Sequence, residues 1–297
     1  MNNNIKIAVA SPSFSANDVL RKNLLEYFTK VKWNDTGKPI PAGDLPSFLD
    51  GADGAITGLD VINGELLDKL PKLKIIAKHG VGLDMIDQRA LETRSVKLGW
   101  TGGVNKRSVS ELTLCFMLGL ARQVFTSCYK CKYEDEWYKK GGFQITGKTI
   151  GIIGFGNIGQ DTALLLKPFE CRILVNDILD VTEQCKKVNA SQVELKELLE
   201  QSDIVTLHVP LNGSTHYMIS KDKINIMKKN AYLINTARGK VINQTDLKHA
   251  LSSGRIAGAA LDVLEEEPPT DTELLSLPNL VISAHIGGSA IEAVHAM

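Results

Sequence analysis

A glycine-rich turn between two apolar runs is the feature that most constrains how this chain can fold. The segment Gly154-Phe-Gly156-Asn-Ile-Gly159 follows the apolar run 150–153, and Asp177 closes the next apolar run, 173–175. In a strand–turn–helix unit, the first glycine permits the tight turn, the second lets a pyrophosphate approach the backbone, and the third lets the helix pack on the sheet. The spacing therefore predicts a crossover unit that binds a dinucleotide.

The acidic residue at position 177 indicates which dinucleotide this is. At this distance from the glycines, a carboxylate accepts hydrogen bonds from the ribose hydroxyls and repels a 2′-phosphate. The stretch Asn176-Asp177-Ile178-Leu179-Asp180 contains no Arg or Lys that could bind such a phosphate. We therefore expect NAD in preference to NADP. The helix that begins at the turn would offer its unpaired N–H groups to the phosphates. The predicted cofactor-binding residues here are Gly154, Gly156, Asn157, Ile158, Gly159 and Asp177.

Composition excludes several classes of protein. The chain has 297 residues, of which 43% are hydrophobic, enough for two domains with separate cores. Lys+Arg and Asp+Glu both total 34, so charge gives no sign of nucleic-acid or membrane binding. The first residues lack the layout of a signal peptide, and no apolar run approaches the ~20 residues of a membrane span. Five cysteines, with one CxxC at Cys128 and Cys131 but no second pair, predict reduced thiols, no metal site and a cytoplasmic protein.

Apolar runs alternate with helical patterns along the whole chain. Runs at 5–10, 54–56, 73–77 and 96–98, with an amphipathic pattern at 19–28, predict a first α/β unit of about a hundred residues. The segment Thr101-Gly-Gly-Val-Asn105 predicts a hinge before a long helix at 108–122. A second unit begins at Ile150, with later strands at 204–207, 231–234, 256–261 and 280–283. We therefore expect an α/β fold with two doubly wound parallel-sheet domains.

Ionisable side chains follow several of the predicted strands. In open parallel sheets, ligands bind beyond the carboxyl ends of the strands, so these positions are candidates for function. The segments that carry them are Lys78-His79-Gly80-Val81-Gly82, Asn235-Thr-Ala-Arg238-Gly, Asp262-Val-Leu-Glu-Glu-Glu267 and Ala284-His285-Ile-Gly-Gly. An Arg, a carboxylate and a His at the strand ends of one sheet indicate a catalytic site.

These segments resemble the D-isomer-specific 2-hydroxyacid dehydrogenases, the family of phosphoglycerate, glycerate and D-lactate dehydrogenases. The blocks that match, in family order, are Gly80-Val-Gly-Leu-Asp84, Gly147-Lys-Thr-Ile-Gly-Ile-Ile-Gly-Phe-Gly-Asn-Ile-Gly159, Asp203-Ile-Val-Thr-Leu-His-Val-Pro-Leu211, Asn235-Thr-Ala-Arg-Gly239 and Gly258-Ala-Ala-Leu-Asp-Val263. The resemblance implies a Rossmann NAD-binding domain, residues 101–286, inserted into a flavodoxin-like substrate-binding domain, residues 1–100 and 287–297. The active site is expected between them, and a homodimer through the NAD-binding domain.

The same resemblance implies an activity and assigns three catalytic residues. The activity is NAD-dependent interconversion of a D-2-hydroxy acid and its 2-keto acid, of the 3-phosphoglycerate, hydroxypyruvate/glycerate or glyoxylate type. The catalytic residues fall on Arg238, Glu267 and His285. A His can protonate the carbonyl oxygen as hydride arrives, because its ordinary pKa lies near neutrality. A neighbouring Glu267 would raise that pKa, and Arg238 would bind the substrate carboxylate through its fork of donors.

Further binding residues complete the expected site. The N–H groups of Val81 and Gly82 would hold the substrate carboxylate, and Lys78 leaves a phosphorylated substrate open. The remaining cofactor-binding residues implied by the resemblance are Val209, Pro210, Thr236, Ala237, Asp262 and Gly288.

Alternative interpretations remain open for some of these residues. A strand-end His can be structural, and Glu265 and Glu266 are expected to be solvated neighbours of Glu267. A nucleotide-sensing scaffold like the corepressors that resemble this family would keep Arg238, Glu267 and His285 yet show little turnover. The lack of a long disordered tail favours an enzyme. The chain also ends at Met297, about two helical turns after Gly288, so the closing helix of the family is either short or trimmed.

Overall fold

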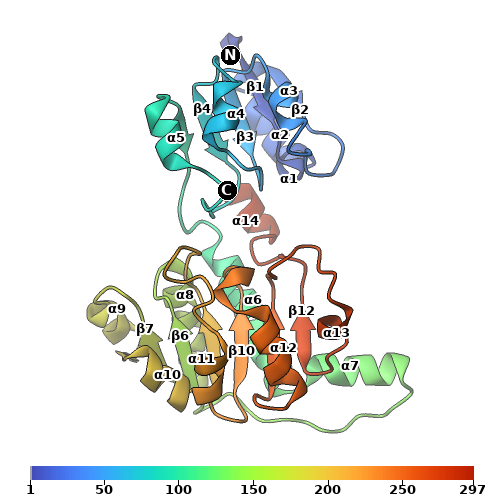
Figure 1. The fold of residues 1–297 in the computed structure, drawn as a ribbon, viewed down its shortest axis with the longest axis vertical. Helices are drawn as coiled ribbons and strands as arrows, with labels where there is room; N and C mark the ends of the chain where they lie inside the picture. Colours follow the sequence, from blue (N-terminus) through green and yellow to red (C-terminus); the bar gives the residue numbers. More distant parts are fainter. Residues whose placement is uncertain (1) are drawn as a thin grey trace. The chain divides into compact units, whose positions relative to one another are not determined.

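The computed structural model describes residues 2–297, which form two compact units (Figure 1). Unit 1 contains residues 2–105 together with Ile291–Met297, and unit 2 is Lys106–Ala290. The chain therefore passes between the units after residues 105 and 290, against the predicted 100 and 286. Each unit is built on one parallel sheet.

The sheet of unit 1 has five strands in the order β2-β1-β3-β4-β5. This order is that of flavodoxin-like folds, with a reversal point between β1 and β3 where ligands bind. The strands are β1 (Asn2–Val9), β2 (Phe28–Trp33), β3 (Gly54–Thr57), β4 (Ile75–Lys78) and β5 (Lys97–Gly99). In the β3–β4 pair, Thr57 lies opposite Lys78, so both reach the same carboxyl edge.

Helices cover both faces of this sheet. Ile7, Val9 and Ile56 point to the face of α1 and α2, whereas Ala8, Ala55 and Ile76 point to the face of α3, α4 and α5. This alternation is the two-residue period of a strand that is buried on both faces. The helices are α1 (Pro12–Ser15), α2 (Asp18–Leu25), α3 (Leu45–Leu49), α4 (Gly64–Asp68), α5 (Gln88–Thr93) and α14 (Ile291–Ala296).

The sheet of unit 2 has seven strands in the order β12-β11-β10-β9-β6-β7-β8. Counted from β6, this is the Rossmann order with one further strand, and its reversal point lies between β6 and β9. The strands are β6 (Thr149–Ile153), β7 (Arg172–Asn176), β8 (Ala190–Gln192), β9 (Ile204–Leu207), β10 (Tyr232–Asn235), β11 (Gly258–Leu261) and β12 (Leu280–Ile282). The predicted α/β fold with two doubly wound parallel sheets is confirmed.

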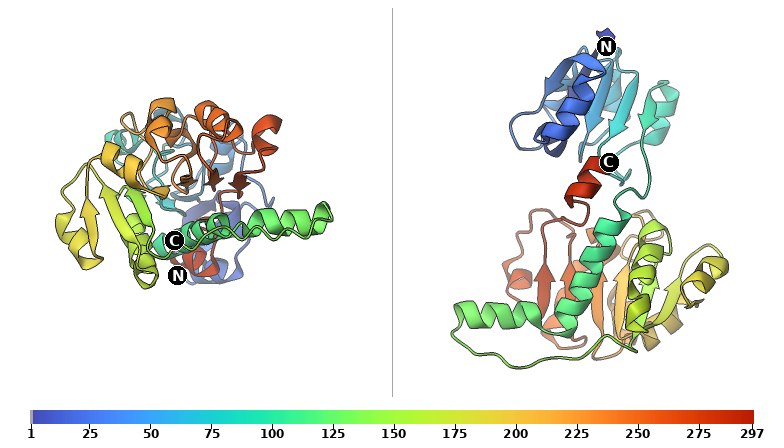
Figure 2. Two further views of the ribbon diagram at one scale, coloured as in Figure 1. Left: turned by 90° about the horizontal axis from the view of Figure 1, so that it is seen from below. Right: turned by 180° about the vertical axis from the view of Figure 1, so that it is seen from behind.

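Two helical layers enclose the sheet of unit 2. Helices α10, α11 and α12 cover one face (Figure 1), and α6 and α8 cover the other (Figure 2). The buried strand residues divide accordingly, Ile153 facing the first layer and Ile152 the second. The helices are α6 (Lys106–Ala121), α7 (Val124–Tyr133), α8 (Asn157–Leu166), α9 (Thr182–Lys187), α10 (Leu195–Gln201), α11 (Lys221–Ile226), α12 (Gln244–Ser252) and α13 (Thr272–Leu275), with short 3-10 turns at Lys167–Phe169 and Gly239–Val241.

Helix α7 projects from unit 2 as an arm, and the chain returns along it (Figure 2). No residue of α7 is buried. Among the described residues no single helix has the length and hydropathy of a membrane span. Helices α6 and α7 together have that length and composition, but they are bent by 65° at the break between them.

Several predicted element boundaries were wrong. The helix expected at 19–28 ends at Leu25, and Phe28 instead begins β2. Strands β2 and β8 were not predicted from the sequence. Both lie at sheet edges, where partly exposed and polar residues dilute the apolar pattern that marks a central strand.

Candidate active site

The glycine turn lies between β6 and α8 in unit 2. Gly154 has φ +89°, a conformation that side chains rarely adopt, and a Cβ atom at Gly159 would lie 2.2 Å from the Gly154 carbonyl oxygen. At Gly156, by contrast, the Cβ position is open, with no atom within 4 Å. Asn157 and Ile158 begin α8 directly behind this open position. The turn therefore offers exposed backbone and a helix N-terminus, as a pyrophosphate requires.

Asp177 follows β7 and is hydrogen-bonded to the glycine turn. Its Oδ2 accepts a hydrogen bond from the N–H of Phe155 at 2.7 Å, and its Oδ1 accepts one from the N–H of Leu179 at 3.0 Å. Each oxygen retains a further lone pair that can accept a ribose hydroxyl. The position and charge of Asp177 therefore suit an unphosphorylated ribose.

The end of β9 lies against the same turn. A Cβ atom at Gly154 would lie 2.6 Å from the carbonyl oxygen of His208, the residue before Val209 and Pro210. The His208 residue is partly exposed, but its Nδ1 is buried and has no partner in the described part of the chain, while Nε2 lies 3.1 Å from Thr206 Oγ1. Burial lowers the pKa of His208, so its ring is neutral. An orphaned polar atom beside the open glycine turn is consistent with a site that a dinucleotide completes.

A turn organised by Asn235 carries Arg238 at the end of β10. Asn235 is fully buried, donates from Nδ2 to the Arg238 carbonyl at 2.8 Å and accepts from the Ala237 N–H at 3.0 Å. Thr236 Oγ1 lies 3.1 Å from Thr113 Oγ1 of α6. These contacts fix the backbone from which the Arg238 side chain extends.

Asp262, at the end of β11, organises the turn that carries His285. Its carboxylate accepts hydrogen bonds from the N–H groups of Ile286 and Gly287, both at 2.8 Å, and from the Ser283 hydroxyl. Its carbonyl accepts the His285 N–H at 2.8 Å. His285 adopts φ +53°, and this set of bonds holds it there. Asp262 was predicted to bind the cofactor. In the structure its buried carboxylate accepts hydrogen bonds from the turn that carries His285.

Glu267 and His285 form a hydrogen-bonded pair beyond β11 and β12. The distance from His285 Nδ1 to Glu267 Oε2 is 2.8 Å, and both side chains are about one-third exposed. The hydrogen bond that His285 donates to Glu267 raises the pKa of His285 against the opposing effects of burial and Arg238. Burial acts to raise the pKa of Glu267, but the hydrogen bonds from His285 and the Leu264 N–H leave it lowered. The pair therefore favours imidazolium with carboxylate.

The predicted substrate-binding residues of unit 1 lie in the loop after β4. Lys78 is buried, and its Nζ donates to the Gly58 carbonyl and lies 3.3 Å from Met85 Sδ. Gly80 has φ +135°, and the Val81 carbonyl accepts a hydrogen bond from Trp100 Nε1 at 2.9 Å. The loop that contains Val81 and Gly82 is thus fixed by its own unit.

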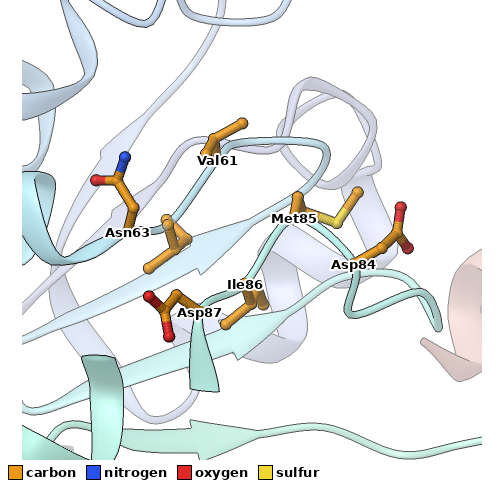
Figure 3. Close-up of a pocket in the computed structure, with 7 residues that line it drawn as sticks. Val61, Asn63, Asp84, Met85, Ile86 and Asp87 are labelled. Atoms are coloured by element: carbon orange, nitrogen blue, oxygen red, sulfur yellow. The ribbon is translucent and has the colours of Figure 1, made fainter. Parts of the chain in front are cut away.

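A surface pocket of about 420 Å³ in unit 1 contains none of the predicted site residues (Figure 3). It lies over the parallel bridge between Ile62 and Ile86. Its polar side chains include Asn63 and Asp87, which cap α4 and α5 by accepting backbone N–H groups. These polar groups are explained by helix capping. Within residues 2–297, no group of three His, Cys, Asp or Glu side chains could hold a metal ion.

Glu265 was expected to be a solvated neighbour of Glu267, but it is only partly exposed and its carboxylate is hydrogen-bonded. Its carboxylate accepts the Gln244 N–H at 2.7 Å and the Tyr217 hydroxyl at 3.0 Å. Both partners are distant in sequence, so no local pattern could have identified them.

Comparison with known proteins places the chain in a family. Residues 114–287 match the family model described as the NAD binding domain of D-isomer specific 2-hydroxyacid dehydrogenases. The chain is 37% identical to the glyoxylate reductase of Thermococcus litoralis, over 92% of this chain and 86% of that one. It is 38% identical to the hydroxypyruvate reductase of Thermotoga maritima, over 93% and 92%. The crystal structure of Aquifex aeolicus D-lactate dehydrogenase with NAD and lactic acid matches with a TM-score of 0.82 and 27% identity, over 98% and 91%.

The fold and these matches define an NAD-dependent oxidoreductase that interconverts 2-hydroxy acids and 2-keto acids. The chain belongs to the D-isomer specific 2-hydroxyacid dehydrogenase family. The resemblance seen in the sequence is thereby confirmed, and so is the prediction that the cofactor is NAD.

Proposed function

We propose that this protein reduces small, unphosphorylated 2-keto acids, with glyoxylate and hydroxypyruvate as its substrates and His285 as the proton donor. The observation that carries the proposal is the hydrogen bond between Glu267 and His285, which raises the pKa of the imidazole. A protonated His285 near neutral pH is what reduction of a carbonyl group requires.

Each remaining residue has a role in this reaction. The glycine turn 154–159 and Asp177 would hold NADH, which would supply a hydride for C2 of the keto acid. Arg238 binds the substrate carboxylate and polarises the carbonyl, and the N–H groups of Val81 and Gly82 bind the other side of the carboxylate. His285 then donates its proton from Nε2 to the carbonyl oxygen, and Glu267 keeps the ring oriented and charged until that transfer. Unit 2 would be the NAD-binding domain and unit 1 the substrate-binding domain.

Two observations favour an unphosphorylated substrate over 3-phosphoglycerate. The relatives at 37% and 38% identity are a glyoxylate reductase and a hydroxypyruvate reductase. In unit 1, the Lys78 ammonium is buried and already donates to Gly58, whereas the same sheet edge carries the hydroxyls of Ser11 and Thr57. The Thr57 Oγ1 is buried and has no hydrogen-bond partner in the described part of the chain. Neutral donors and acceptors suit a hydroxymethyl group better than a phosphate.

A panel of keto acids tests the proposal directly. Glyoxylate, hydroxypyruvate, pyruvate and 3-phosphohydroxypyruvate would be compared by the loss of NADH absorbance. We expect kcat/KM to be highest for glyoxylate or hydroxypyruvate. A preference for the phosphorylated acid would overturn the substrate assignment. Tight NADH binding without turnover on any acid would instead support the nucleotide-sensing scaffold.

The arm α7 supports a homodimer formed through unit 2. It exposes Tyr129, Tyr133 and, in the segment that returns from it, Trp137, which is 80% exposed. Aromatic residues gathered on a projecting helix suit a protein interface. Sedimentation at micromolar concentration should give twice the monomer mass of 32.4 kDa, and a monomer would exclude the dimer. We also propose a cytoplasmic location, where the five thiols stay reduced, and cell fractionation tests it.

A further inference from the structure

We infer that Glu265 is a positioning residue for the Glu267–His285 pair, which it supports through the backbone of the loop that carries Glu267. The inference rests on the proposed roles of Glu267 and His285. It concerns a residue that contacts neither the imidazole ring nor the predicted cofactor turn.

Glu265 is joined to α12 by a reciprocal pair of hydrogen bonds. Its Oε1 accepts the backbone N–H of Gln244 at 2.7 Å, and its own N–H donates to Gln244 Oε1 at 3.2 Å. Gln244 is the first residue of α12, where the N–H group has no partner inside the helix. A carboxylate at this helix end is also favoured by the helix dipole. Both the side chain and the backbone of Glu265 are therefore fixed.

A third hydrogen bond comes from Tyr217. Its hydroxyl donates to Glu265 Oε2 at 3.0 Å, and this bond raises the pKa of the tyrosine, which stays a donor. Tyr217 is itself held at φ +52° by a hydrogen bond from its N–H to the Lys240 carbonyl at 2.8 Å. The Glu265 carboxylate thus connects three separate segments of unit 2.

The loop around Glu265 also lies directly on the turn that carries Arg238. A Cβ atom at Gly239 would lie 1.9 Å from the Leu264 carbonyl oxygen and 2.5 Å from the Glu265 nitrogen. The two backbones can approach this closely because residue 239 has no side chain. A displacement of Glu265 would therefore move the loop relative to Arg238 as well.

Glu265 is connected to the Glu267–His285 pair through the peptide bond to its neighbour Leu264. The N–H of Leu264, the preceding residue, donates to Glu267 Oε1 at 3.0 Å. That bond leaves Glu267 Oε2 directed at His285 Nδ1, 2.8 Å away. By holding the backbone next to Leu264, Glu265 fixes which Glu267 oxygen is available for the imidazole.

The charges that face His285 come from Glu267, Arg238 and Asp262, and Glu265 is not among them. An effect of Glu265 on His285 must therefore pass through the orientation of Glu267. This separates a positioning role from direct electrostatic catalysis, and it also gives the test a specific signature.

The three hydrogen bonds that join Glu265 to Gln244 and Tyr217 are called the Glu265 clamp below. Glu265→Gln and Tyr217→Phe weaken this clamp from its two ends, and Glu266→Gln is the matched control. Glu266 is the exposed neighbour, and its carboxylate accepts a hydrogen bond from the Thr270 hydroxyl at 3.0 Å. The measurements, on the 297-residue chain, are kcat and KM for glyoxylate, the pH profile of kcat, and the titration midpoint of His285 by NMR. Glu267→Gln serves as the reference for complete loss of the pair.

We expect Glu265→Gln to lower kcat by about 10-fold or more, as small displacements of catalytic groups do. The His285 midpoint should move down toward 6.5, as in Glu267→Gln, while the KM for NADH stays constant. Glu266→Gln should remain within about 2-fold of the wild type. Adding Tyr217→Phe to Glu265→Gln should have little further effect, because both changes break the same clamp.

Two results would count against different claims. If Glu265→Gln lowers thermal stability but leaves kcat and the His285 midpoint unchanged, the residue is merely structural and the inference is wrong. If Glu267→Gln also leaves both unchanged, the proposed function itself fails.

Discussion

The two units carry a histidine at the same kind of position, yet the two histidines differ in every property that matters for catalysis. His285 follows β12 of unit 2, is partly exposed, pairs with Glu267, and has a raised pKa. His79 follows β4 of unit 1 and is buried, and burial lowers its pKa. Its Nδ1 lies 3.1 Å from the Ser11 hydroxyl, and its Nε2 lies 3.3 Å from the Val294 carbonyl of α14.

The difference shows how partners, rather than position, decide the role of a strand-end histidine. A carboxylate stabilises the imidazolium, so His285 can hold a proton near neutrality. Hydroxyl and carbonyl groups in a buried site satisfy a neutral ring, so His79 joins the end of β1, the loop after β4 and α14. The contacts of His285 suit the proposed proton transfer, and those of His79 suit a structural role at the loop after β4.

The largest expected effect comes from making the same substitution at each histidine. His285→Ala should lower kcat by about 10²–10⁴-fold, the usual contribution of a general acid, with the Kd for NADH unchanged. His79→Ala should act on stability instead, lowering the free energy of unfolding by about 1–3 kcal/mol through lost buried hydrogen bonds. Steady-state kinetics and urea unfolding of both variants measure the contrast. Equal losses of kcat in the two variants would show that His79 and His285 do not differ in their contribution to catalysis.

Much of this comparison could be predicted from the sequence, but not all of it. The glycine turn and Asp177 are local patterns, and apolar runs predicted both sheets apart from β2 and β8. The roles of Arg238, Glu267 and His285 were implied by the family resemblance. The clamp at Glu265 could not be predicted, because Tyr217 and Gln244 meet it only after the sheet has formed. Exposed edge strands such as β2 were missed for a related reason, since their apolar pattern depends on burial.

A smaller effect is expected at Asp177, the acidic residue that follows β7 in unit 2. Asp177→Ala removes the carboxylate that would repel a 2′-phosphate, so the ratio of kcat/KM for NADH and NADPH should fall toward one. We expect a loss with NADH, because the ribose hydroxyls lose an acceptor, and no loss with NADPH. Initial rates with both cofactors measure the ratio. Asp180→Ala, at a neighbouring exposed acid, is the control. Comparable kcat/KM values for the two cofactors in the wild type would contradict the role given to Asp177.

The smallest expected effect is a difference in how the two histidines make stability depend on pH. The folded-state pKa of His79 is lowered, so below about pH 6.5 the unfolded chain binds a proton that the folded chain does not, and stability falls as pH falls. The folded-state pKa of His285 is raised, so its contribution is present below about pH 6.5 and is lost as pH rises through the folded-state value. Each slope is at most about 1.4 kcal/mol per pH unit, and that of His285 is smaller because solvent screens the pair.

Urea unfolding from pH 5 to 8 would therefore separate the two histidines by the direction of the change. His79→Gln should flatten the acid side of the stability curve, and His285→Gln should remove a decline on the alkaline side. His208, whose pKa burial also lowers, contributes equally to the wild type and both variants, so differences from the wild type isolate the residue that was changed. If His285→Gln altered the acid side in the manner of His79→Gln, the imidazole of His285 would be neutral in the folded protein, and it could not be the proton donor.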